Sequence, residues 1–501
     1  MINSKPLQVF VIALITLFVA SCGGDNANVA DIGTGGTGVA SGSISGFGSV
    51  YVNGVKHKTT TAKITDDDAE DNVVISEDKL KVGQVVDIKG RAEDSKNSVA
   101  EIMEKAAEVK GPVDSLYDAA TKTIKVMGQT VLIDNNTSID NNVGANGVGD
   151  LKVGDLVEAH GFRNATGVIV ATRIEKQGPI AQYRVRGFIT GLDTTKKEFK
   201  IGELVVDYGS AQIVPTGAIL ADGLRVGVKA QNAPDATTGK LTAIKVKVKK
   251  AEDAGRSELE GVITKFTSTT DFEINGIKVT TSASTVYEHG TAADLKEGAR
   301  VEAKGAVTNG VLTATKIEFQ SRGDNLNQDS SRIRLSGLVA ASSATDKTVT
   351  ILGQKFIVND ATRFEDRVAD TRPFNIANFD TLVKAGAHVQ VIAYKSGADL
   401  IATRVEVNNA TGAFVQGALG PGATASSTSL LIQGVNVKID SGTRFYAGDE
   451  RHGGAIADLA AFLAKAPAGT IVKAKSKATP LAGDTSIDAT GANQGEVEIE
   501  D

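Results

Sequence analysis

The chain has 501 residues, a formal net charge of −6 at pH 7, no tryptophan, and only 5% aromatic residues. The acidic balance argues against binding to the phosphate backbone of nucleic acids, which requires a basic face. The scarcity of aromatic rings disfavours stacking platforms for bases or sugars. We therefore expect no nucleic-acid partner.

Residues 1–21 are typical of an export signal and are not expected to belong to the fold. The uncharged run from Pro6 to Ser21 is too short for a comfortable membrane span. It leads into Cys22, the only cysteine of the chain. The sequence Val19-Ala20-Ser21-Cys22 resembles the lipobox of bacterial lipoproteins. This resemblance implies lipidation of Cys22, and the alternative is an ordinary signal peptide that happens to contain a cysteine.

A lipid on Cys22 would make the membrane a partner of the protein. No aspartate follows Cys22, which by resemblance to enterobacterial sorting signals favours the outer membrane, facing the periplasm or the exterior. Residues 22–41 are rich in Gly, Ala, Asn and Thr, a composition that predicts a flexible tether.

A glycine-centred phrase then recurs six times. The aligned glycines Gly54, Gly128, Gly202 and Gly276 are each 74 residues apart, and two further copies are centred on Gly353 and Gly434. A regular period of this kind indicates copies of one small domain. The predicted domains are residues 42–110, 111–180, 181–252, 257–320, 333–409 and 413–501.

Each copy shows the same predicted elements in order. A strand pair flanks the glycine phrase, in which Asn-Gly or Gln-Gly fits a tight hairpin. A Leu-x-x-Gly phrase precedes an alternating strand, as in residues 80–90, 151–161 and 295–305, and a closing strand follows, as in residues 170–175. The segment before Leu-x-x-Gly is short in the early copies. In the last copy it has apolar residues at helical spacing: Ile456, Leu459, Ala460 and Leu463.

A variable helix or loop between the third and fourth of five strands is typical of an OB-like barrel. We therefore predict an all-β protein of six tandem OB-like β-barrels, with a plain β-sandwich as the alternative. The charged stretches 251–258 and 320–332 favour some independence between neighbouring domains.

The phrases at residues 46–55 and 80–90, with the closing Ala-x-x-Ile pattern, resemble the bacterial "domain of unknown function 5666" family. Its members are tandem-repeat exported proteins, frequently lipoproteins. The resemblance implies an OB-type barrel and no particular activity. The barrel pattern also resembles the periplasmic haem chaperone of cytochrome c maturation. That protein depends on a histidine and a nearby tyrosine in a C-terminal tail, which no repeat has here, so we expect no cofactor.

Candidate reactive residues do not recur at one repeat position. The five histidines fall at unrelated places, without the spacing of a zinc site. The densest acidic run could bind Ca²⁺ weakly or form a solvated loop, because its spacing is not that of an ordered calcium loop. Its carboxylates are Asp66, Asp67, Asp68, Glu70 and Asp71. In the fifth copy Phe364, Phe374 and Phe379 either bind a partner or fill their own barrel.

The leading hypothesis is a non-enzymatic, lipid-anchored envelope protein that binds or scaffolds an unknown envelope protein through tandem domains. The alternative is a carrier or sensor in which one specialised copy holds a small ligand or a cation.

Overall fold

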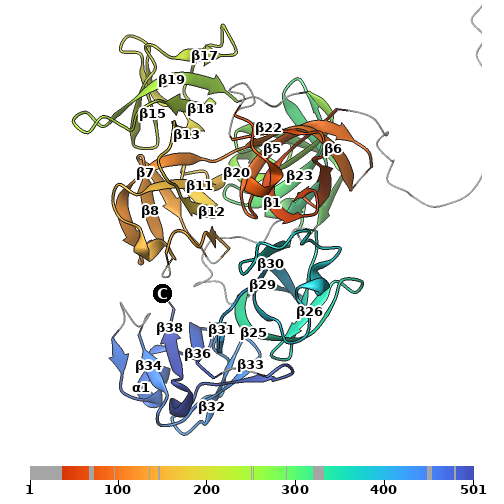
Figure 1. Ribbon diagram of the computed structural model, residues 1–501, viewed down its shortest axis with the longest axis vertical. Helices are drawn as coiled ribbons and strands as arrows, with labels where there is room; N and C mark the ends of the chain where they lie inside the picture. The colour runs from red at the N-terminus through yellow and green to blue at the C-terminus, as the bar shows by residue number, and fades with distance from the viewer. Residues whose placement is uncertain are drawn as a thin grey trace, which may run out of the picture.

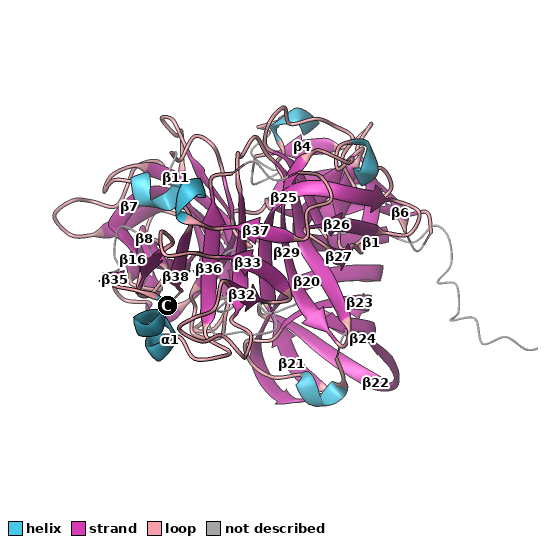
Figure 2. Cartoon of the chain, turned by 90° about the horizontal axis from the view of Figure 1, so that it is seen from below, coloured by secondary structure: helices cyan, strands magenta, loops and turns pink. Residues whose placement is uncertain are grey.

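The computed structural model describes residues 37–66, 73–94, 96–134, 136–144, 147–249, 251, 253–288, 290–319, 332–360, 362–447, 454–478 and 481–500. The regular secondary structure of these residues is almost entirely β-strand, with one short α-helix and a few 3₁₀ turns (Figure 2). No helix in these ranges is long and apolar enough to cross a membrane.

The first strands close into a small barrel. They are β1 (Thr37–Phe47), β2 (Val50–Val52), β3 (Val55–Lys58), β4 (Lys63–Thr65), β5 (Val85–Ala92) and β6 (Asn97–Lys105). β1 pairs antiparallel with β2 and β5, β2 forms a hairpin with β3, and β3 and β4 both lie parallel to β6, which pairs with β5. The order β1-β2-β3-β6-β5-β1 is the five-stranded Greek-key closure of an OB barrel, and the 3₁₀ turn η2 (Glu77–Lys79) occupies the position of its helix.

The same order of pairing recurs along the chain and gives several small barrels rather than β-sandwiches. The next one contains β7 (Val109–Asp118), β8 (Thr123–Val126), β9 (Gln129–Leu132), β10 (Ser138–Ile139), η3 (Gly147–Asp150), β11 (Leu156–Arg163) and β12 (Ile169–Lys176). It is followed by β13 (Tyr183–Phe188), β14 (Thr190–Asp193), β15 (Glu198–Ile201), β16 (Leu204–Asp207), β17 (Gln212–Val214), β18 (Arg225–Ala230) and β19 (Lys240–Val248).

The second half of the chain repeats the pattern. One barrel contains β20 (Ala254–Ser268), β21 (Asp271–Ile274), β22 (Ile277–Glu288), η4 (Ala292–Asp294), β23 (Arg300–Thr308) and β24 (Val311–Phe319). The next contains β25 (Arg332–Ser343), β26 (Thr348–Ile351), β27 (Gln354–Ile357), β28 (Arg363–Asp366), η5 (Phe379–Thr381), β29 (His388–Ser396) and β30 (Asp399–Val407).

The last strands form a looser version, in which β37 and β38 share the role of the closing strand. Its elements are β31 (Ala413–Ala418), β32 (Ser429–Ile432), β33 (Val435–Lys438), β34 (Arg444–Tyr446), β35 (Ala455–Ile456), α1 (Leu459–Lys465), β36 (Ile471–Ser476), β37 (Ser486–Asp488), η6 (Gly491–Asn493) and β38 (Glu496–Ile499). The predicted helix is α1, which buries Leu459 and Phe462, whereas Ile456 lies in β35.

The glycine phrase forms the predicted hairpin turn. In the β2–β3 hairpin both turn residues have positive φ, 54° at Asn53 and 71° at Gly54, as a type I′ turn requires. Gly202 of the β15–β16 hairpin also has a positive φ of 58° but stands first in its turn. The glycine therefore supplies the left-handed backbone conformation that closes each hairpin.

Barrels also pair with one another through their first strands. β7 pairs antiparallel with β13, and β25 pairs antiparallel with β31. β1 pairs in parallel with β20, which joins two barrels that are not neighbours in the sequence (Figure 1).

This parallel pairing corrects the expectation for residues 251–258. Gly38 to Ser41 pair with Arg256 to Leu259, so most of the stretch expected to loosen the chain is part of β20. The end of the predicted tether, Thr37–Ser41, likewise belongs to β1. Residues 320–331 lie outside the described part of the chain.

Candidate functional site

A row of residues, all polar except Gly227, crosses three neighbouring strands at the same place in each barrel. Its first member is the residue immediately before a glycine in the first strand, and the others are its cross-strand neighbours in register. The rows are Ser41–Asp87–Glu104, Lys110–Glu158–Glu175, Arg186–Gly227–Lys247, Glu260–Glu302–Glu318, Ser336–Gln390–Glu406 and Gln416–Lys473–Glu498. The position therefore repeats while its charge changes from barrel to barrel.

Two of these rows meet across a contact between barrels, and their charges are complementary there. The basic row of the β13–β19 barrel faces the acidic row of the β1–β6 barrel, with Arg186 Nη1 3.3 Å and Lys249 Nζ 3.4 Å from the Asp87 carboxylate. Burial alone would raise the pKa of Asp87, but Lys249 and Arg186 hold it well below its usual range. Opposite charges brought together in this way favour one docking partner over another.

A second cluster joins the β1–β6 and β7–β12 barrels around Glu158, which is 1% exposed. Its carboxylate lies 2.9 Å from Lys105 Nζ, 3.1 Å from Lys110 Nζ and 2.9 Å from His160 Nε2. The other ring nitrogen, His160 Nδ1, accepts a hydrogen bond of 3.1 Å from the backbone N–H of Val85 in β5. Although burial opposes ionisation, Lys105 and His160 hold the pKa of Glu158 well below its usual range. The imidazole thus links the two barrels directly.

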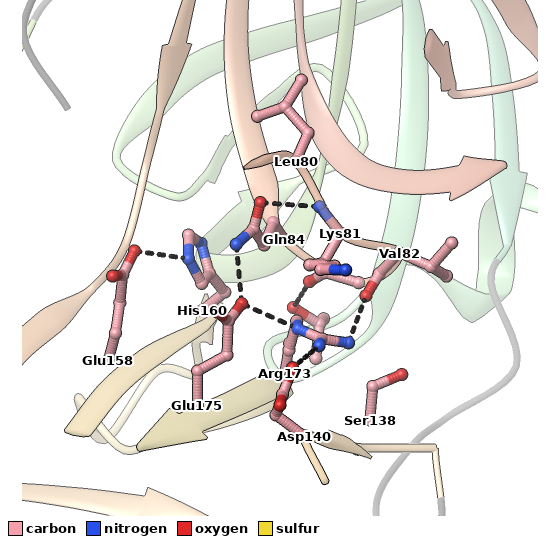
Figure 3. A network of polar contacts seen from close by, with 12 residues as sticks. Leu80, Lys81, Val82, Gln84, Ser138, Asp140, Glu158, His160, Arg173 and Glu175 are labelled. Atoms are coloured by element: carbon pink, nitrogen blue, oxygen red, sulfur yellow. Dashed lines mark hydrogen bonds and ion pairs between the residues drawn. The ribbon is translucent and has the colours of Figure 1, made fainter. Parts of the chain in front are cut away.

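Arg173 is the centre of a third cluster (Figure 3). Its guanidinium contacts Asp140 and Glu175 of its own barrel, at 2.7 Å for Glu175, and lies 3.1 Å from Glu365 of β28. It also donates a hydrogen bond of 3.1 Å to the carbonyl of Val82. One buried side chain therefore ties together the β1–β6, β7–β12 and β25–β30 barrels.

The electrostatic environment of this third cluster fixes its charge state. Burial alone would raise the pKa of Glu365, but Arg404 and Arg173 hold it at about 2. For Arg173, the carboxylates of Glu175 and Glu365 outweigh the effect of burial and raise its pKa above the ordinary value. The charges therefore persist over the whole physiological range.

A polar cavity of about 50 Å³ lies at the junction of the β1–β6, β7–β12, β20–β24 and β25–β30 barrels. Arg300, Arg363 and Arg404 line it, together with Glu260, Glu302 and Glu318 of the all-acidic row. These lining residues come from strands that are far apart in the sequence. Arg363 Nη2, for example, lies 3.2 Å from Ser43 Oγ, although the two residues are more than 300 positions apart.

Two side chains that line this cavity have strongly shifted pKa values. Burial raises the pKa of Glu302 to about 8, with Glu318 and Glu258 adding to the effect against the opposing Lys304. Burial and the neighbouring Arg300 lower the pKa of Arg363 to about 10. Both shifts are caused mainly by burial, which disfavours the charged form of each side chain.

The predicted calcium ligands are only partly within the described residues. Asp66 is described, and its carboxylate lies 3.2 Å from both Lys105 Nζ and Lys110 Nζ and 3.6 Å from Arg184 Nη1. Three cations of the same chain thus surround Asp66 and oppose a metal ion there. Asp67, Asp68, Glu70 and Asp71 lie outside the described residues. Elsewhere in the described ranges, no group of three or more His, Cys, Asp or Glu side chains could hold a metal ion.

The aromatic side chains proposed as partner contacts are core residues. Phe364, Phe374 and Phe379 are at most 2% exposed, and the Phe364 ring lies 5.6 Å from Phe374 and 5.4 Å from Phe379 between centroids. Because they are buried, they cannot meet another molecule, and the alternative that they fill their own barrel is the one observed. Phe374 also exchanges two backbone hydrogen bonds with Phe47, which docks this segment onto β1.

The remaining predicted site residues are scattered. Cys22 lies outside the described residues, as do His289 and His452. His57 contacts Ser98 at 2.6 Å, and burial, with Arg256, lowers its pKa to about 3. His388 bonds Asn408 and the carbonyl of Gly412. The described histidines therefore lie in separate places, as their sequence positions suggest.

The residues at the barrel junctions were not singled out from the sequence. The available signal was the residue before the first-strand glycine, which reads Ser41-Gly42, Lys110-Gly111, Arg186-Gly187, Glu260-Gly261, Ser336-Gly337 and Gln416-Gly417. A polar residue that recurs inside an otherwise half-buried strand, with a changing charge, marks a contact surface.

Comparison with known families agrees with this architecture. The family model described as "Domain of unknown function (DUF5666)" matches residues 37–104, 110–175, 260–318 and 336–406, which together make up more than half of the chain. The four matches fall on the β1–β6, β7–β12, β20–β24 and β25–β30 barrels. No curated protein matches the chain.

Proposed function

The chain belongs to the family of proteins built from the domain of unknown function DUF5666, and on this premise we propose that it is a non-enzymatic scaffold held at the cell envelope by a lipid on Cys22. Tandem repeats of this domain suggest a scaffolding or binding role. In this proposal the outer membrane carries the anchor, and the array of barrels presents surfaces to an envelope protein.

The parallel pairing of β1 with β20 is the observation that carries the scaffold proposal. A chain of independent domains needs no contact between its first and fourth repeats. Here a shared sheet joins them, and buried ion pairs such as Arg173–Glu365 link further barrels. An array fixed in this way can hold binding surfaces at constant spacing, which supports a scaffold more than a string of separate binding modules.

Lipid labelling tests the anchor. Cells that express wild type or Cys22→Ala are grown with labelled palmitate, and the protein is isolated from fractionated membranes. The proposal requires label and outer-membrane recovery for wild type, with both lost in Cys22→Ala. Equal labelling of the two proteins would overturn the lipid anchor.

Co-purification tests the scaffold role. The intact lipoprotein is isolated from cross-linked cells, alongside Arg173→Met, which breaks the buried cluster, and Lys196→Met, whose salt bridge to Asp193 is exposed. A true scaffold loses its envelope partner in Arg173→Met and keeps it in Lys196→Met. Recovery of the same partner in equal amounts from all three proteins would show that the fixed array is unnecessary.

A further inference from the structure

We propose that the cavity at the junction of four barrels binds a small zwitterion, a molecule such as an α-amino acid that carries a carboxylate and an ammonium group a few atoms apart. The inference is independent of the scaffold function, because the cavity is formed by the docked barrels whatever partner they present.

The size of the cavity restricts the ligand. A volume of about 50 Å³ exceeds the ~10–15 Å³ that one water molecule needs. It is far smaller than the clefts of about 300–1,000 Å³ that hold drug-sized ligands. Only a molecule of a few non-hydrogen atoms fits, and the lining is too polar for an apolar one.

One part of the lining carries surplus hydrogen-bond donors and positive charge. Arg363 is 6% exposed and donates to two neutral acceptors, the carbonyl of Asn136 and Ser43 Oγ, each at 3.2 Å. Among the described residues, no carboxylate forms an ion pair with it. The nearby Glu260 is already engaged, since it accepts Arg300 and both the backbone N–H and the hydroxyl of Ser43.

Two further donors in the same lining are unsatisfied. The Nε atoms of Arg300 and Arg404 are buried and have no hydrogen-bond partner among the described residues. Leaving a buried donor unpaired costs about 1–3 kcal/mol, more for a charged group. A carboxylate offers two oxygens with about four acceptor sites, which matches this surplus of guanidinium N–H groups.

Another part of the lining is a row of three carboxyl groups. Glu260, Glu302 and Glu318 stand directly opposite one another on β20, β23 and β24, an arrangement in which like charges repel. Lys304 Nζ lies 2.8 Å from Glu302 and also donates to the carbonyl of Asn53, and Lys316 Nζ lies 3.4 Å from Glu318. Burial and this repulsion keep Glu302 protonated near neutral pH, and an ammonium group in the cavity would favour its ionised form.

Both halves of the lining together select the ligand. A simple anion would satisfy the arginines but would face the row of glutamates. A metal cation would suit the glutamates but would be repelled by Arg300 and Arg363. A molecule that presents a carboxylate to Arg363 and an ammonium group to Glu302 complements both at once.

Calorimetric titration of the full chain with glycine tests the proposal. Acetate and methylammonium, which carry one charge each, serve as probes of the two halves, and 4-aminobutanoate tests the spacing of the charges. The proposal predicts saturable heat with glycine and at least tenfold weaker binding of the other three. No heat with glycine, or acetate binding as tightly as glycine, would overturn it.

Substitutions in the lining test whether glycine binds in the cavity. Arg363→Gln and Glu302→Gln should each weaken glycine binding at least tenfold. Arg334→Gln is the matched control, because Arg334 is a half-buried arginine that does not line the cavity and lies over Phe414. If Arg363→Gln does not fold, Ser45→Leu fills the cavity from β1 and leaves the arginines in place. Unchanged binding in the cavity variants would contradict the assignment.

Discussion

At the scale of single residues, the position before the first-strand glycine decides how otherwise similar barrels recognise one another. Ser41, Lys110 and Glu260 occupy this position in different barrels and are neutral, positive and negative, respectively. Their cross-strand neighbours add to the difference, so each barrel offers a distinct polar row. Electrostatic complementarity of this kind specifies partners more than it adds stability.

Arg173→Met should destabilise the folded chain by about 3–5 kcal/mol, because it removes a buried guanidinium and leaves the half-buried carboxylates of Glu175, Glu365 and Asp140 without their shared cation. Urea unfolding followed by circular dichroism measures this change. The control is Lys196→Met, which removes an exposed ion pair of 3.4 Å with Asp193. This substitution should change the free energy of unfolding by at most ~0.5 kcal/mol. Equal effects of the two substitutions would contradict the buried-cluster account.

Glu302 should make stability depend on pH. Its pKa is raised to about 8 in the folded state from an ordinary 4.5, so the folded chain holds a proton that the unfolded chain releases. Its contribution to the free energy of unfolding is therefore full below about pH 4.5 and falls as the pH rises to about 8, by at most ~1.4 kcal/mol per pH unit. Urea unfolding at pH 5, 6.5 and 8.5 should show this fall in wild type.

Urea unfolding of Glu302→Gln at the same three pH values isolates the contribution of Glu302, because the other ionisable residues are common to both proteins. The difference between wild type and variant should change steadily with pH over this range. A constant difference would mean that Glu302 does not titrate there.

At the scale of elements, the hairpin turn serves both the barrel and the contact between barrels. Gly128 has a φ of 68°, and a Cβ atom built on it would lie 2.7 Å from the backbone N of Leu204 in β16. Gly128 also accepts a hydrogen bond of 3.0 Å from the N–H of Glu203 through its carbonyl. Glycine is therefore needed for its backbone conformation and for its lack of a side chain.

Comparing Gly128→Ala with Gly154→Ala separates these two requirements. Gly154 has a φ of 89°, but a Cβ atom there would meet nothing within 4 Å. Gly154→Ala should cost only the strain of a left-handed alanine, about 1–2 kcal/mol. Gly128→Ala should lower the free energy of unfolding further, because the β7–β12 and β13–β19 barrels must also move apart. Equal losses in both variants would show that the turn plays no part in the contact.

The sequence predicted the local elements better than their docking. The hairpins at Gly54 and Gly128 and the OB-like order of strands follow from turn chemistry and period-two alternation, which act within one repeat. The helix near Leu459 was predicted in the same way.

The pairing of Gly38–Ser41 with Arg256–Leu259 could not be predicted, because hydrophobic alternation says nothing about which strand edge meets another barrel. The charged residues of 251–258 suggested a linker for the same reason: the backbone of Arg256 to Glu258 pairs with β1, which a local sequence pattern does not reveal. The cavity between Arg363 and Glu302 depends on that docking, so it was also missed.

At the scale of the whole molecule, contacts between distant parts of the chain define one array. The β1–β6 barrel contacts the β25–β30 barrel through the Phe47–Phe374 backbone pair and through exposed ion pairs. Lys81 Nζ lies 2.5 Å from the Asp370 carboxylate, and Lys96 Nζ lies 3.4 Å from Asp360. These exposed pairs contribute little stability, but they report directly on the relative position of two barrels.

Zero-length carbodiimide coupling, which joins a lysine amine to a carboxylate in contact, followed by peptide mass spectrometry tests the docked array most directly. In dilute wild-type protein we expect amide links between Lys81 and Asp370 and between Lys96 and Asp360, in yields that do not change with protein concentration. In Lys81→Arg, the first link should disappear and the second remain. If neither link forms while Lys125–Glu203, an exposed pair at 2.7 Å between the β7–β12 and β13–β19 barrels, is recovered, the docking of the β1–β6 and β25–β30 barrels would be contradicted.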